Sequence, residues 1–293
     1  MTIDKSGYTY CHEHLHIDLS YVKGDPDCLL NQYENIRDEL ASLKNQGVSN
    51  IIEVTNRFMG RNPHFIESLM RDTEMNVLLS TGYYIDGFFP DRVQHFSERQ
   101  IADEMIVELT SGIDGSRLTA SLIGEIGSSE NQFTEAEQKI FRAAAIAHLE
   151  TGAPISTHTS FTTCGIEQID LLRSMKVNLE NVTIGHCDLD DNFDYLLRLV
   201  DSGCMIQFDT IGKNNYYPDE KRANTIMELI NRGYVEQIML SMDITRCSHL
   251  KANGGLGFSY LIDNFIPRLK KKGVNDNYIE VMMKDNPNKF FSY

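Results

Sequence analysis

The stretch Tyr8-Thr9-Tyr10-Cys11-His12-Glu13-His14-Leu15-His16 predicts a strand that ends in a pair of histidines. Its β-branched and aromatic beginning favours a strand over residues 8–11. His12 and His14 are two positions apart, so on extended backbone their imidazoles point to the same side. Imidazole is the commonest protein ligand for zinc and its neighbours. The pair is therefore half of a candidate divalent-metal site, although a polar strand end without a metal fits the same two residues.

Seven more strand-like runs follow along the chain, each separated from the next by a loop and a helical pattern. They cover residues 50–54, 76–80, 120–126, 155–157, 182–185, 205–208 and 238–242. Period 3.6 places Tyr33, Ile36 and Leu40 on one helix face. Capping boxes beginning at Ser97 and Thr134 mark the starts of two further helices.

Eight strands that alternate with helices, without an Asn-Gly hairpin signal between them, favour parallel pairing. Eight such units in 293 residues fit a closed (β/α)8 TIM barrel, which typically takes about 250 residues. An open doubly wound sheet is the alternative, but the glycine-rich turn that it usually carries after its first strand is absent. No linker or charge block divides the chain, so we expect one α/β domain over residues 1–293.

The composition excludes several classes of function. The chain has 27 basic and 42 acidic residues, a net charge of −15 and no basic tract, which argues against nucleic acid and anionic membranes as partners. No apolar run is long enough for a transmembrane helix, and no apolar leader is visible. The six cysteines form no CxxC pair, as expected of reduced thiols. We therefore expect a cytoplasmic protein.

In a (β/α)8 barrel the chemistry lies at the C-terminal ends of the strands. Five of the eight strand ends carry side chains that can bind metals, namely His12 and His14, Glu125, His158, His186 and Asp243. Each has an ordinary structural explanation by itself, such as an ion pair for Glu125 or a helix cap for Asp243. Four histidines and two carboxylates on one rim, however, are costly to bury without cations that share their lone pairs. Together they predict a metal site.

These residues resemble the ligand set of the binuclear amidohydrolase superfamily: His-x-His on strand one, a carboxylate on strand four, histidines on strands five and six, and aspartate on strand eight. The contexts His12-Glu13-His14, Ile184-Gly185-His186 and Asp243 are most similar to the phosphotriesterase-like branch, over essentially the whole chain. The resemblance implies two divalent metal ions, with zinc as the expected metal. It assigns His12, His14 and Asp243 to the buried ion, His158 and His186 to the more exposed ion, and Glu125 to the bridge between them.

Two positions depart from the phosphotriesterase pattern. Glu125 stands where those enzymes carry a carboxylated lysine, so this site needs no carbon dioxide to assemble. On strand seven, Asp209 is followed by Thr210, where those enzymes have a histidine of their proton relay. This second departure argues against true triesterase activity.

We expect metal-assisted hydrolysis, in which a hydroxide that bridges the two ions attacks an ester, lactone or phosphoester bond. Asp243 is the expected catalytic residue, because a carboxylate beside the hydroxide can take its proton and pass it to the leaving group. The ligand set does not choose between a carbonyl and a phosphoryl centre. The alternative is a non-catalytic metal-binding barrel that has lost turnover. A third hypothesis, a mononuclear deaminase, is weakened by Glu125, which points to a second metal.

Four rim residues are candidate substrate contacts, namely Arg57, Tyr84, Lys213 and Arg246. Three cations on the catalytic side of so acidic a chain predict an anionic small-molecule substrate, because charge-assisted hydrogen bonds to such groups are strong. The alternative is that these cations pair with nearby acids such as Asp86, Asp219 or Glu220, and that the aromatic residues only pack the loops. The sequence predicts no oligomeric state.

Overall fold

Eight parallel strands form one sheet in the order β1-β4-β5-β6-β7-β8-β9-β10. The computed structural model describes residues 2–292. The strands are Tyr8–Glu13 (β1), Val48–Glu53 (β4), Asn76–Thr81 (β5), Ala120–Ser128 (β6), Ile155–Thr159 (β7), Val182–Ile184 (β8), Met205–Phe208 (β9) and Ile238–Leu240 (β10). Every predicted strand is present, and the strands pair in sequence order.

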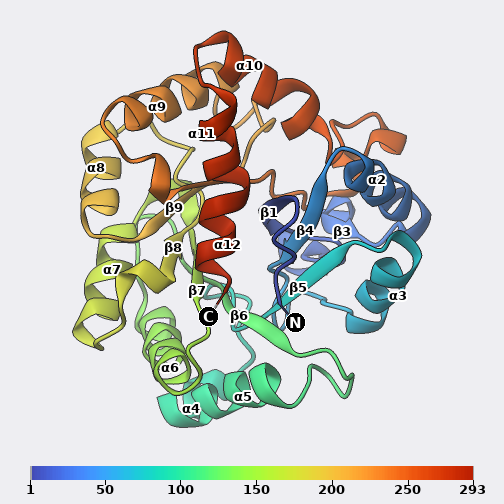
Figure 1. Cartoon of the computed structure of the whole chain (residues 1–293). Coiled ribbons are helices and arrows are strands. Elements are labelled where there is room, and N and C mark those ends of the chain that lie inside the picture. Colours follow the sequence, from blue (N-terminus) through green and yellow to red (C-terminus); the bar gives the residue numbers. More distant parts are fainter. Residues whose placement is uncertain (1, 293) are drawn as a thin grey trace.

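The sheet curves round until its first and last strands meet. His12 at the end of β1 donates its backbone N–H to Oγ of Ser241 at 3.1 Å, just beyond β10. The backbone N–H of Asp243 in turn donates to the carbonyl oxygen of His12 at 3.2 Å. The prediction of a (β/α)8 barrel is therefore confirmed (Figure 1).

Helices surround the strands (Figure 1). Their bounds are Ser20–Lys23 (α1), Tyr33–Asn45 (α2), Pro63–Thr73 (α3), Arg92–His95 (α4), Glu98–Thr110 (α5), Glu135–Thr151 (α6), Gly165–Ser174 (α7), Phe193–Asp201 (α8), Asp219–Asn231 (α9), Ile266–Lys271 (α10), Asp276–Glu280 (α11) and Asn286–Phe290 (α12). Both predicted capping boxes are present, at the starts of α5 and α6.

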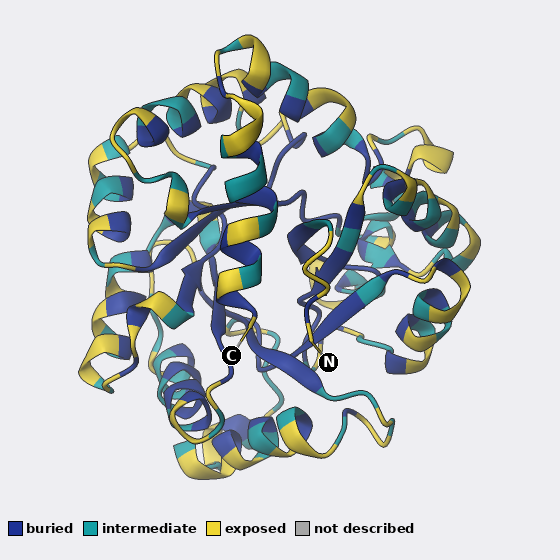
Figure 2. Cartoon of the chain, in the orientation of Figure 1, coloured by how far each residue is buried: buried dark blue, intermediate teal, exposed yellow. Residues whose placement is uncertain are grey.

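Burial divides the molecule into layers. The strands are almost entirely buried, while the helices turn their exposed faces outward (Figure 2). On β4, Ile51 packs in the large cluster that also holds the inner faces of the helices, whereas Ile52 packs in a smaller cluster with Leu78 and Leu122 of neighbouring strands. This alternation is the period of two that a strand imposes on its side chains.

The loop after β1 contains a small antiparallel sheet that sequence periodicity did not predict. It pairs Ile17–Asp18 (β2) with Leu29–Leu30 (β3), and α1 lies between them. Strands of two residues are too short to show a periodic pattern. This sheet holds the residues from 19 to 28 at the edge of the cavity described below.

Candidate metal centre and the adjoining cavity

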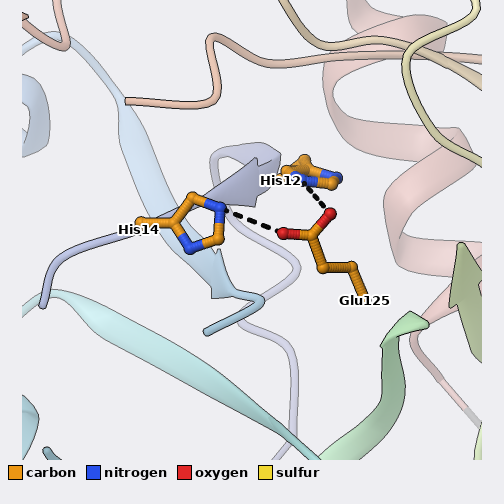
Figure 3. Close-up of side chains that lie close together, drawn as sticks. All are labelled: His12, His14 and Glu125. Atoms are coloured by element: carbon orange, nitrogen blue, oxygen red, sulfur yellow. Dashed lines mark ion pairs between the residues drawn. The ribbon is translucent and has the colours of Figure 1, made fainter. Parts of the chain in front are cut away.

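The carboxylate of Glu125 on β6 lies at the centre of the site. The residue is 2% exposed, and its Oε1 lies 3.3 Å from Nε2 of His14. Its Oε2 lies 3.5 Å from Nε2 of His12 (Figure 3). The same Oε2 lies 3.1 Å from Nδ1 of His158 on β7 and 3.8 Å from Nε2 of His186 after β8. One carboxylate thus lies between two pairs of histidines, one from the N-terminal strand and one from strands in the middle of the chain.

Asp243 completes this group from the loop after β10. Its Oδ1 lies 3.2 Å from Nε2 of His14 and 3.8 Å from Nε2 of His12. Its Oδ2 forms an ion pair with Nζ of Lys213. The fold therefore brings together the six residues that the sequence singled out, and we call them the site cluster: His12, His14, Glu125, His158, His186 and Asp243.

The site cluster contains buried polar atoms that have no hydrogen-bond partner among the described residues. These atoms are Nε2 of His12, Nε2 of His14, Oε2 of Glu125 and Nδ1 of His158. Buried polar atoms are normally satisfied, and a group of unsatisfied imidazole nitrogens and carboxylate oxygens is the donor set that divalent metals such as zinc take. The residues therefore fit a metal ion, and the triads His12–His14–Glu125 and Glu125–His158–His186 each have ligand atoms close enough together to hold one.

Hydrogen bonds behind the rings aim these nitrogens inward. Nδ1 of His12 lies 3.0 Å from Oε1 of Gln207, and Nδ1 of His14 lies 2.7 Å from Oγ1 of Thr55. Such partners fix the tautomer and the orientation of a histidine ligand. Sequence reasoning missed Gln207 and Thr55, because no local pattern shows which distant residue lies behind a ring.

Asp209 lies behind one histidine from each pair. It accepts hydrogen bonds from the backbone N–H of His186 at 3.0 Å and from Nδ1 of the same residue at 2.8 Å. Its Oδ2 lies 3.2 Å from Nδ1 of His12. The next residue, Thr210, lines the cavity beside the site cluster and donates its hydroxyl to Asp188 at 2.9 Å.

Charge within the site cluster favours cations. Burial alone would raise the pKa of Glu125, but the charge of His12 and the close imidazoles of His14 and His158 hold that pKa well below its usual value. Burial likewise opposes ionisation of Asp243, yet Lys213 and His14 hold its pKa well below the usual value. Burial lowers the pKa of His14, but the close carboxylates of Asp243 and Glu125 outweigh it and raise the pKa to about 10. The two carboxylates are therefore anionic and attract positive charge.

A cavity of about 240 Å³ opens beside the site cluster. Three of the predicted rim residues, Tyr84, Lys213 and Arg246, line it together with members of the site cluster. The hydroxyl of Tyr84 lies 3.4 Å from Nε2 of His158. Lys23 of α1 also lines the cavity, and sequence reasoning missed it because a helix of four residues is too short to show a periodic pattern.

Arg57 does not lie where the sequence placed it. Among residues 2–292, it is not part of the cavity wall. Its guanidinium instead lies 2.6 Å from Glu108 and 3.7 Å from Glu104, both on α5. Glu108 is 3% exposed, so Arg57 forms a partly buried ion pair with it instead of facing the cavity. The expectation of a substrate-facing Arg57 is corrected on this point.

Two of the acids proposed as alternative partners for the rim cations, Asp219 and Glu220, also pair elsewhere. Asp219 bonds the buried Arg222 at 2.9 Å, and Glu220 bonds Arg268 at 2.8 Å. Arg246 is paired instead with Asp25, at 2.5 Å, in the loop after β1.

None of the helices in the described part of the chain is both long and apolar enough to cross a membrane.

The fold and the site cluster define a TIM-barrel protein with a metal-compatible group of histidines and carboxylates at the C-terminal ends of its strands. The chain belongs to the Phosphotriesterase family, whose family model matches residues 2–291. Over 291 residues it is 53% identical to the phosphotriesterase homology protein of Escherichia coli (strain K12). This alignment covers 99% of this chain and 100% of that protein. A crystal structure of that protein, described with phosphate in its active site, superposes with a TM-score of 0.98 and covers 99% of this chain and 100% of that chain.

Two more distant relatives are named as hydrolases. An N-acetyltaurine hydrolase of Dictyostelium discoideum is 33% identical over 94% of this chain and 78% of that protein. An aryldialkylphosphatase of Saccharolobus solfataricus is 33% identical over 98% of this chain and 95% of that protein. The family thus includes hydrolases that act on different small molecules.

Proposed function

We propose that this protein is a binuclear metal-dependent hydrolase, with zinc as the expected metal, that cleaves an ester, lactone or phosphoester bond in an anionic small molecule. The observation that carries the proposal is the Glu125 carboxylate, which lies between two histidine pairs whose inward ring atoms include three buried nitrogens without a partner. The hydrolase names of two relatives agree with this reading.

We keep the ligand assignment that the family resemblance implies, and the short distances within the site cluster support it. His12, His14 and Asp243 would hold one ion, His158 and His186 would hold the other, and the unmodified carboxylate of Glu125 would reach both. The ions would supply Lewis-acid polarisation of the scissile bond and activation of the attacking water. Each ligand lies on a barrel strand or just beyond its end, so the barrel fixes the positions of the residues that would hold the ions.

Asp243 is placed to move the proton of the reaction. Its carboxylate lines the cavity and is held anionic by Lys213, so it can accept a proton from the attacking water and deliver it to the leaving group. Lys213 fixes the direction of Oδ2, because a buried ion pair restricts both side chains. Thr210 stands where phosphotriesterases carry a histidine of their proton relay, and it cannot take the part of that histidine. Its hydroxyl is already bonded to Asp188. We therefore propose esters, lactones or charged phosphoesters as substrates, and not neutral phosphotriesters.

The cavity wall supports an anionic substrate. Its cations are Lys23, Lys213 and Arg246, and its carboxylates are Glu125 and Asp243. Two divalent ions would make this cavity strongly positive within a chain of net charge −15. Lys213 and Arg246 already have carboxylate partners, but Lys23 has none within residues 2–292. Lys23 and the unpaired edge of the Arg246 guanidinium are therefore available to a carboxylate or phosphate. The phosphate in the active site of the Escherichia coli relative is in keeping with this charge.

Metal content and substrate charge together test the proposal. The purified protein is stripped with a chelator, reloaded with zinc and analysed by elemental analysis. Hydrolysis is then compared on matched pairs: 4-nitrophenyl acetate against mono-4-nitrophenyl glutarate, a dialkyl aryl phosphate against 4-nitrophenyl phosphate, and γ-butyrolactone against a carboxylated lactone. We expect two equivalents of zinc and a higher kcat/KM for the charged member of at least one pair. Two bound ions without turnover across the panel would favour the metal-binding barrel that has lost its activity.

A further inference from the structure

Glu13, the residue between the two β1 histidines, holds the backbone on both sides of Asp243. Its Oε1 accepts hydrogen bonds from Oγ of Ser241 and from the backbone N–H of Met242, each at 2.7 Å. Its Oε2 accepts the backbone N–H of Ile244 at 3.0 Å. One side chain of β1 therefore binds the residues before and after Asp243 in the loop that follows β10.

The backbone at Asp243 needs such support. Asp243 has a φ of 52°, in the left-handed region that non-glycine residues rarely adopt. Strained backbone of this kind persists only where the surrounding structure determines it, and it is common at functional sites. Here the N–H of Asp243 is bonded to His12, and the next N–H is bonded to Glu13. The strained residue is thus held between two neighbouring residues of β1.

Packing alone gives no reason for a carboxylate at this position. Glu13 is fully buried, and within the described residues 2–292 it forms no ion pair. Burying an unpaired carboxylate is costly, so stability by itself favours an apolar side chain. What only a carboxylate offers is two acceptor oxygens on one rigid plane. A glutamine would present an NH2 group to one of the two sets of donors.

We propose that Glu13 is a positioning residue that sets the place of the Asp243 carboxylate against the rest of the site cluster. This inference rests on the proposed function, because it assigns Glu13 a part in aligning the residue that moves the proton. It adds a role for the middle residue of His12-Glu13-His14 that metal binding alone does not require. A shift of the order of 1 Å at a catalytic group can lower a rate about a hundredfold.

Amide hydrogen exchange tests this role without relying on activity. In Glu13→Gln, we expect the segment 239–250 to exchange faster than in the wild type, because Met242 or Ile244 loses its acceptor. On a substrate found in the panel above, kcat should fall by about tenfold to a hundredfold with KM changed by less than about twofold. Ser241→Ala removes one donor to Glu13 and is the second variant should Glu13→Gln fail to fold. It should accelerate exchange in the same segment to a smaller extent.

Glu137→Gln is the matched control. Glu137 is also fully buried and accepts bonds from Ser129 at 3.0 Å and Thr134 at 2.8 Å, but it is not part of the cavity wall. This variant should accelerate exchange near residues 128–134 and leave kcat within about twofold of wild type. Unchanged exchange over 239–250 in folded Glu13→Gln would overturn the proposal. So would an equal loss of kcat in Glu137→Gln. A wild-type protein without hydrolysis would reject the proposed function, whereas exchange would still decide what Glu13 holds.

Discussion

Oε2 of Glu125 lies 3.1 Å from Nδ1 of His158, while the other oxygen of the same carboxylate faces His14 at 3.3 Å. One unmodified glutamate therefore spans the distance between the β1 and β7 strand ends. A longer carboxylated lysine is not needed for this contact.

The first prediction concerns that carboxylate. Glu125→Gln should lose at least one of two zinc equivalents, because an amide lacks the second anionic oxygen with which one group binds both ions. Elemental analysis after zinc-replete growth measures the loss. Full retention of both equivalents would contradict the bridging assignment. Glu137→Gln is again the control, since its carboxylate lies outside the cavity wall.

The second prediction concerns the proton. Asp243→Asn should keep most of the metal but lower kcat by about a hundredfold to ten-thousandfold, because an amide can ligate weakly and cannot carry the proton. Steady-state kinetics alongside metal analysis separate the two effects. A near-wild-type rate on a confirmed substrate would show that another group moves the proton.

The third prediction separates the cations by their position. Lys23→Gln and Arg246→Ala should each lower kcat/KM for the charged substrate by about tenfold, on the order of 1.4 kcal/mol, and spare its neutral partner. Arg57→Ala should leave this ratio unchanged, because Arg57 faces Glu108 instead of the cavity. Lys271→Gln, which removes an exposed cation from α10, is the control for net charge. Equal losses on both substrates would show that Lys23 and Arg246 are structural.

The fourth prediction concerns stability near Thr210. The guanidinium of Arg222 is fully buried and bonds Asp188 at 2.8 Å and Asp219 at 2.9 Å. Arg222→Leu should therefore lower the free energy of unfolding by about 3–5 kcal/mol, because it leaves a buried carboxylate without a partner. Urea denaturation measures the change. Arg37→Leu, which breaks an exposed pair with Asp38, should cost within about 0.5 kcal/mol. Equal costs for the two variants would contradict this account of the buried network.

The sequence by itself determined the barrel and the composition of the site cluster. Short apolar runs indicate the strands, and a parallel barrel places all of their C-terminal ends on one rim. His12 and Glu125 lie within such runs and Asp243 lies shortly after one, so strand order alone brings them together. No long-range information was needed for this step.

Only the tertiary structure decided where the rim side chains point and what holds them. Arg57 pairs with Glu108, which is 51 residues away, and Arg246 pairs with Asp25, which is 221 residues away. Glu13 binds an amide 231 residues along the chain. Loops have no periodicity. A long charged side chain of a loop pairs with a carboxylate that lies near it in space, and the sequence does not show which carboxylate that is. The same physical reason kept Lys23 and the contacts of Glu13 out of the sequence prediction.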